Sequence, residues 1–105
     1  MHRRQHDKLE AIFNPRSIAI VGASRGKKVG GLVIRYFLRA GYEGKLFPVN
    51  PTEREILGLK TYASVREIPE PVDYVIVMVP AAAVLGVIDD CVAAGVGAVQ
   101  FFTAG

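Results

Sequence analysis

Apolar runs of strand length alternate along the chain with segments of helical spacing. Residues 18–21 are apolar at every position, and residues 73–79 form the strongest β-branched run of the chain. Lys45–Val49 and residues 98–102 supply two further predicted strands. Because residues 18–21 are apolar on both faces, they suit the middle of a parallel sheet that is covered by helices.

Two segments between these strands have the periodicity of helices. In residues 31–40 apolar side chains recur at helical spacing, with Arg35 and Arg39 on the other side. Gly41 follows directly and is placed as a C-terminal cap. The apolar side chains that share one face of residues 81–94 are Val84, Leu85, Ile88 and Val92.

The order of these elements predicts a parallel α/β sheet with right-handed crossovers. A helix between two strands carries the chain back to the end of the sheet where the first strand began, so the second strand runs in the same direction. The connection over residues 52–68 is charged and weakly periodic, and a small extra strand or turn is expected at Leu57-Gly58-Leu59 and Thr61-Tyr62. Residues 1–8 are polar and basic and are predicted to form a disordered tail. Residues 9–105 then make up the domain.

Composition is that of one small globular domain. Half of the 105 residues are hydrophobic, which is enough for a buried core. No apolar run approaches the ~20 residues that span a bilayer and no signal segment opens the chain, so we expect a soluble, cytoplasmic protein with no membrane partner. The net charge of +3 is modest and most basic residues are scattered, which disfavours nucleic acid as a partner.

The first predicted strand breaks into a glycine-containing, basic loop just before the first helix. Small residues at a strand end let the backbone approach a ligand, and the helix N-terminus presents free N–H groups to an anion. The pattern therefore predicts a phosphate-binding loop. Its residues are Gly22, Ala23, Ser24, Arg25, Gly26, Lys27, Lys28, Val29 and Gly30.

Two other loops are expected at the same edge, because ligands of parallel α/β sheets bind at the carboxyl ends of the strands. These loops hold Asn50-Pro51-Thr52 and Pro80-Ala81-Ala82. The sequence at Pro80 also fits a tight turn that any such sheet needs, so that loop is open to both interpretations.

The first loop departs from two familiar phosphate motifs. A Walker loop has four residues between its glycines, whereas three separate Gly22 from Gly26, and no hydroxyl residue follows Lys28. The dinucleotide fingerprint also fails, since its glycine spacing is absent and no acidic residue ends the second strand. The basic residues still suit a ligand with several negative charges, such as coenzyme A or NADP. They are Arg25, Lys27, Lys28 and Arg54.

A series of longer motifs runs through the chain: NPRSIAIVGAS, KVGG, GYEGKLFPVNP, EILGLKTYASVREIPEPVDYVIVMVPAAAV and the closing FFTAG. Over about residues 9–105 they resemble the coenzyme A-binding domain that begins NDP-forming acyl-CoA synthetases, including the ADP-forming enzymes, which are relatives of the succinyl-CoA synthetase alpha subunit. The resemblance implies an α/β fold with a Rossmann-like, doubly wound, mostly parallel sheet in a single three-layer domain. It also implies coenzyme A as the ligand.

The resemblance assigns a part of coenzyme A to each loop. Residues 24–29 would hold the pyrophosphate and 3′-phosphate region, Val49-Asn50-Pro51 would lie by the adenosine, and Val79-Pro80-Ala81 would line the pantetheine path. The first loop departs from many relatives, which carry Pro-Gly before Lys-Val-Gly where this chain has Arg-Gly-Lys-Lys.

Catalysis is expected to need more than this chain. In the family the phosphorylated histidine and the ATP-grasp nucleotide site lie in later domains, whereas His2 and His6 lie in the basic tail. Cys91 lies among apolar residues of a predicted helix and is expected to be a buried, inert thiol, and no metal-ligand set is evident. The expected role is to position the coenzyme A thiol for acyl transfer from an acyl phosphate made on other synthetase domains or subunits.

Two alternatives stay open. An NADP-binding redox or sensor module would use Asn50 and Arg54 on a 2′-phosphate. A regulatory module without turnover would bind coenzyme A or its thioesters and would need no phosphorylated histidine.

Overall fold

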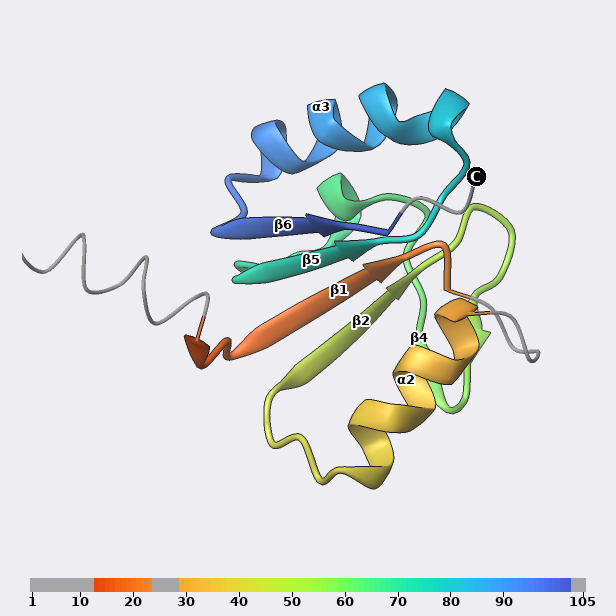
Figure 1. The fold of residues 1–105 in the computed structure, drawn as a ribbon, viewed down its shortest axis with the longest axis vertical. Helices are drawn as coiled ribbons and strands as arrows, with labels where there is room; N and C mark the ends of the chain where they lie inside the picture. Colours follow the sequence, from red (N-terminus) through yellow and green to blue (C-terminus); the bar gives the residue numbers. More distant parts are fainter. Residues whose placement is uncertain (1–12, 24–28, 103–105) are drawn as a thin grey trace, which may run out of the picture.

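Four parallel strands form one sheet in the order β2-β1-β5-β6 (Figure 1). The computed structural model describes residues 13–23 and 29–102, so the predicted tail over residues 1–8 lies outside the described residues. The strands are β1 (Ser17–Val21), β2 (Lys45–Val49), β5 (Tyr74–Val77) and β6 (Ala98–Phe101). All four predicted strands are present, and the predicted parallel α/β sheet is confirmed.

Helices cover the two faces of the sheet (Figure 1). Helix α2 (Val29–Arg39) joins β1 to β2, and α3 (Val84–Ala94) joins β5 to β6 after a short 3-10 helix, η2 (Ala81–Ala83). The two connections run in opposite directions across the sheet, so right-handed crossovers place their helices on opposite faces. The predicted doubly wound, three-layer domain is thus confirmed.

The connection after β2 forms a small hairpin of β3 (Glu55–Ile56) and β4 (Leu59–Lys60), followed by a 3-10 helix, η1 (Val65–Glu67). Leu57 and Gly58 make the turn, with φ angles of 51° and 79°. Two positive φ angles are typical of the turn that best matches the twist of a two-residue hairpin. The extra strand expected around Leu57-Gly58-Leu59 is therefore a pair of strands with its turn at the first two of these residues.

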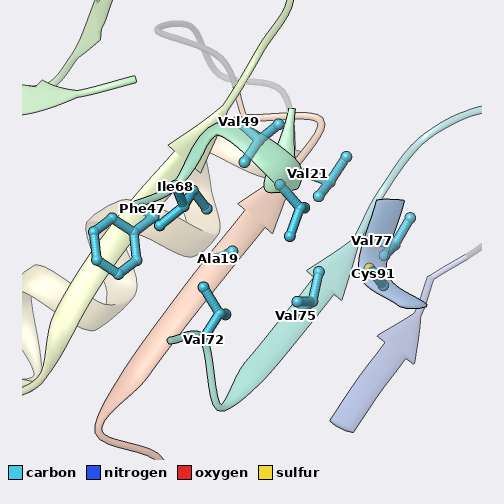
Figure 2. Close-up of a cluster of buried hydrophobic side chains, with 10 residues drawn as sticks. Ala19, Val21, Phe47, Val49, Ile68, Val72, Val75, Val77 and Cys91 are labelled. Atoms are coloured by element: carbon cyan, nitrogen blue, oxygen red, sulfur yellow. The ribbon is translucent and has the colours of Figure 1, made fainter. Parts of the chain in front are cut away.

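Strand β1 is buried along its whole length and contributes to two apolar clusters. Alternate side chains point to opposite faces of a strand, so one set packs under α3 and the other under α2. The α3-side core consists of Ala19, Val21, Phe47, Val49, Val65, Ile68, Val72, Val75, Val77 and Cys91 (Figure 2). The α2-side core consists of Ile18, Ile20, Ala23, Ile34, Ile56 and Ile76.

Helix α3 is apolar on more than one side, and the side that it buries contains Cys91 and, half-buried, Val87. The predicted burial of Cys91 is confirmed at 3% exposure, and burial raises the pKa of its thiol. Of the apolar face predicted from Val84, Leu85, Ile88 and Val92, Val84 is half-buried and the other three are exposed, with Leu85 and Val92 each 75% exposed. Within the described residues, no helix is long and apolar enough to cross a membrane.

Candidate functional site

The loops that follow β1, β2 and β5 leave the sheet at its carboxyl edge (Figure 1). Gly22 and Ala23 come directly after β1, Asn50 comes directly after β2, and Val79 follows β5. The structure therefore brings the starts of all three predicted loops to one edge. The stretch from Ser24 to Lys28, which holds most of the predicted phosphate loop, lies outside the described residues.

The first two loops are tied together by hydrogen bonds. The backbone N–H groups of Gly22 and Ala23 donate to the carbonyl oxygen of Val49, with N···O distances of 3.2 and 3.3 Å. In return, the Asn50 side chain donates from Nδ2 to the carbonyl oxygen of Ala23 at 2.8 Å. These hydrogen bonds therefore hold the starts of the two loops against each other.

The carbonyl end of the Asn50 side chain organises its own turn. Its Oδ1 accepts hydrogen bonds from the Thr52 backbone at 2.9 Å, the Thr52 hydroxyl at 3.0 Å and the Glu53 backbone at 3.1 Å. The Asn50 backbone N–H donates to the Tyr62 carbonyl oxygen at 2.9 Å. Oδ1 is thus used by protein donors and one N–H of Nδ2 by Ala23, so a phosphate contact of Asn50 would depend on its second N–H, and the NADP hypothesis stays a prediction.

Sequence reasoning missed Tyr62 and Met78 as structural supports of this edge. Tyr62 forms an isolated parallel bridge with Val49, extending the pairing of β2 outward. It lies in the weakly periodic connection, and no local pattern connects it to β2. The Asn-Pro-Thr sequence, in contrast, is typical of turns in which an asparagine side chain bonds to the backbone two residues on.

Two glycines allow the backbone of β1, β5 and α2 to approach closely. A Cβ on Gly22 would lie 2.1 Å from the Met78 carbonyl oxygen, and the φ angle of Gly22 is +95°. A Cβ on Gly30 would lie 2.2 Å from the carbonyl oxygen of Gly22. The Met78 backbone therefore excludes a side chain at Gly22, while contact of the Gly22 backbone with a ligand stays a prediction.

The N-terminus of α2 is suited to an anion. The helix begins at Val29 and has no acidic side chain in its first turn. An eleven-residue helix carries a partial positive charge at this end. The basic residues Arg25, Lys27 and Lys28 come just before it in the sequence. Their contact with phosphate stays a prediction.

The third loop is largely exposed. Val79 is half-buried against the α3-side core, whereas Pro80 and Ala81 are exposed at the start of η2. Pro51 is also exposed, and so is Arg54. These exposed residues lie around the carboxyl edge and do not cover it. In the described part of the chain, no group of His, Cys, Asp and Glu side chains could hold a metal ion.

A doubly wound parallel sheet with a helix N-terminus and small residues at its carboxyl edge defines a Rossmann-like domain for an anionic ligand. The family described as CoA binding domain matches residues 16–105. The chain therefore belongs to this family of coenzyme A-binding domains.

Curated and solved relatives agree with this assignment. The alpha subunit of acetate–CoA ligase [ADP-forming] I from Pyrococcus furiosus is 43% identical over 102 residues, which cover 92% of this chain and 22% of the relative. The dinucleotide-forming acetyl-coenzyme A synthetase 1 of Candidatus Korarchaeum cryptofilum, solved with phosphate and ADP, has a TM-score of 0.89 at 46% identity, over 94% of this chain and 22% of that chain. The chain thus spans about a fifth of these enzymes.

A smaller solved protein has the same fold. A conserved hypothetical protein from Pyrococcus furiosus has a TM-score of 0.75 at 40% identity and aligns with 83% of this chain and 74% of its own. The fold therefore occurs in short chains as well as in long synthetase subunits.

Proposed function

We propose that this chain is the coenzyme A-binding module of an ADP-forming or other NDP-forming acyl-CoA synthetase. The observation that carries the proposal is the convergence of the starts of three loops and the α2 N-terminus at the carboxyl edge of a domain of the coenzyme A-binding family. The proposed ligand contacts are those named from the sequence, from Gly22 to Gly30, at Val49-Asn50-Pro51 and at Val79-Pro80-Ala81.

The module acts by positioning. The basic loop holds the phosphates, and the extended pantetheine arm passes along the edge so that its thiol meets an acyl phosphate made elsewhere. The thiolate sulfur then bonds to the acyl carbon as phosphate leaves. Anchoring the remote nucleotide lowers the entropic cost of bringing thiol and acyl group together.

The proposal includes partner domains or subunits that carry the phosphohistidine and the ATP-grasp site, and a cytoplasmic location. The small share of the synthetase chains that this chain spans supports such partners. The exposed apolar side chains Leu85 and Val92 on α3 also support them, because large exposed apolar side chains that cluster mark interaction surfaces. Catalysis by the chain alone is not part of the proposal.

Calorimetric titration of the purified chain with coenzyme A, dephospho-coenzyme A and NADPH tests the proposal. We expect coenzyme A to bind, and to bind more tightly than dephospho-coenzyme A, because the 3′-phosphate adds charge for the basic loop to hold. Binding of NADPH without coenzyme A would refute the proposal in favour of a redox module. Binding of coenzyme A without any synthetase partner in the cell would favour a regulatory module.

A pair of double variants locates the site. Lys27→Ala/Lys28→Ala is expected to weaken coenzyme A binding by about 1–3 kcal/mol, through loss of charge-assisted phosphate contacts. Arg39→Ala/Lys45→Ala removes the same charge from the end of α2 and the start of β2, and is expected to bind normally. Equal weakening by the two variants would show that the loss comes from the lower net charge of the protein and not from contacts of the basic loop.

A further inference from the structure

Asn50 connects the two loops that frame the proposed nucleotide site. Its Nδ2 donates to the Ala23 carbonyl oxygen, the last acceptor before residues 24–28, and its Oδ1 accepts three hydrogen bonds from Thr52 and Glu53. The two backbone donors to Oδ1 fix the orientation of the amide group, because only the oxygen can accept from an N–H. The side chain therefore has one possible assignment of its oxygen and nitrogen.

The Ala23 peptide has little freedom apart from this hydrogen bond. Ala23 is 1% exposed, and its N–H and that of Gly22 share the Val49 carbonyl oxygen as acceptor. The first turn of α2 lies on the other side, since a Cβ on Gly30 would lie 2.9 Å from the Ala23 Cα. Asn50 supplies the side-chain hydrogen bond that orients the Ala23 carbonyl group within this packing.

We infer that Asn50 is a positioning residue, whose side-chain hydrogen bond to Ala23 sets the direction in which the chain leaves β1 toward the basic loop. The inference rests on the proposed function, because it concerns the loop assigned to the coenzyme A phosphates. The three protein donors to Oδ1 and the hydrogen bond from Nδ2 to Ala23 hold the amide group in one orientation.

Two substitutions separate the two ends of the side chain. Asn50→Asp keeps an oxygen for Thr52 and Glu53 but replaces the donor to Ala23 with a second acceptor. Thr52→Val removes one hydroxyl donor from Oδ1 and leaves the hydrogen bond to Ala23 in place. The first variant therefore breaks the contact between the loops, and the second is its matched control.

Amide hydrogen exchange of the free protein tests the contact without any ligand. In Asn50→Asp the amides of Gly22 and Ala23 are expected to exchange on the order of tenfold faster, as loss of one hydrogen bond predicts. In Thr52→Val they are expected to exchange as in the unchanged protein. Unchanged exchange in Asn50→Asp would overturn the inference.

Coenzyme A titration then tests the positioning role in a double-mutant cycle. Asn50→Ala is expected to weaken coenzyme A binding on the order of tenfold and dephospho-coenzyme A binding by less, because the displaced loop also loses its contact with the 3′-phosphate. Lys27→Ala is expected to cost less in the Asn50→Ala background than alone, because the loop is already displaced. Additive losses would show that Asn50 acts independently of the basic loop and would overturn the inference.

The two proposals fail in different ways. If the unchanged protein does not bind coenzyme A, the proposed function is wrong and the exchange experiment still decides the role of Asn50. If coenzyme A binds and exchange at Gly22 and Ala23 is unaffected by Asn50→Asp, the function stands and the positioning role is wrong.

Discussion

Gly22 has no room for a side chain, because the end of β1 lies directly against the backbone of Met78. The φ angle of +95° adds a second constraint, since residues with a Cβ rarely adopt it. Gly41 shares only the second constraint: its φ angle is +73°, and nothing lies within 4 Å of the point that a Cβ would occupy. Comparing alanine variants at Gly22 and Gly41 therefore separates the cost of a steric clash from the cost of backbone strain.

Gly22→Ala is expected to destabilise the fold more than Gly41→Ala. The Gly41 variant should cost about 1–2 kcal/mol for left-handed backbone alone. The Gly22 variant should cost roughly a further 1–3 kcal/mol, because the Met78 carbonyl group must shift to admit the new carbon. Urea unfolding of both variants measures the difference. Equal losses would contradict the close approach of β1 and β5.

Stability at alkaline pH depends on two acidic groups, the buried Cys91 thiol and the partly buried Tyr42 hydroxyl. Burial, with a smaller contribution from Asp90, raises the pKa of Cys91 above its ordinary value of 9.0. Burial, with a smaller contribution from Asp73, raises the pKa of Tyr42 above 10.0. A raised pKa in the folded state favours the protonated form, so its stabilising contribution is complete below the ordinary pKa and is lost as the pH rises through the folded value.

The free energy of unfolding is therefore expected to fall as the pH is raised from about 8 to about 10.5. In the double variant Cys91→Ala/Tyr42→Phe the fall should be smaller, although the variant starts from a lower stability because it loses packing and the hydrogen bond from Tyr42 to the Pro15 carbonyl oxygen. Urea unfolding at several pH values gives both slopes. An unchanged slope in the double variant would assign the alkaline loss to other groups.

The residues of the site could be named from the sequence more easily than their partners. Asn50 could be proposed as a site residue from the sequence, because it follows a strand whose carboxyl end faces the expected ligand edge of the sheet. Its hydrogen bond to Ala23 joins residues 27 positions apart, and no local pattern contains that information. The close approach of Gly22 to Met78 is likewise a property of the assembled sheet.

At the scale of elements, strands were predicted more accurately than the buried side of α3. The β-branched runs stand out because two buried faces leave few polar positions. Helix α3 has apolar residues nearly all round, so periodicity alone could not choose between the side with Cys91 and the side with Leu85 and Val92. Packing against η1 decides it, and an ion pair between Arg66 and Asp90, with an Nε···Oδ1 distance of 2.6 Å, joins the two.

Helix α3 contains a glycine that its packing does not require. Gly86 has open space around its Cα, whereas Gly95 ends the helix with a φ angle of +68°. Gly86→Ala is expected to raise the free energy of unfolding by about 0.5–1 kcal/mol, because alanine is the better helix former. Gly95→Ala is expected to lower it by about 1 kcal/mol through strain at the cap. If thermal unfolding shows that both variants are more stable, or both less stable, than the unchanged protein, this account of the helix is wrong.

For the whole molecule, the alternation of strands and helices was enough to predict a doubly wound sheet. The hand of the crossovers then determines which helix lies on which face. The same rule applies at the outer edge of the sheet. A further parallel strand beside β6 would be reached by a crossover on the α3 face, with its helix next to α3.

That position adjoins an apolar stripe on α3, formed by Leu85, Ile88 and Val92, which are 75%, 36% and 75% exposed. Their spacing of three and four residues places them on one helix face. The synthetase and short-chain relatives are all longer than the part that this chain spans. We therefore expect neighbouring structure to cover the stripe in such proteins, and we expect the exposed stripe to promote self-association of the 105-residue chain.

Leu85→Lys/Val92→Lys is expected to reduce self-association of the 105-residue chain at high concentration, because two charges interrupt the stripe. Both side chains are exposed, so the free energy of unfolding should change by no more than roughly 0.5 kcal/mol. Leu38→Lys, at a side chain 48% exposed on α2, is the control and should leave self-association as it is. Sedimentation velocity over a range of concentrations measures the effect. If the Leu38 variant reduces self-association and the double variant does not, the self-associating surface lies on the α2 side of the sheet and not on α3.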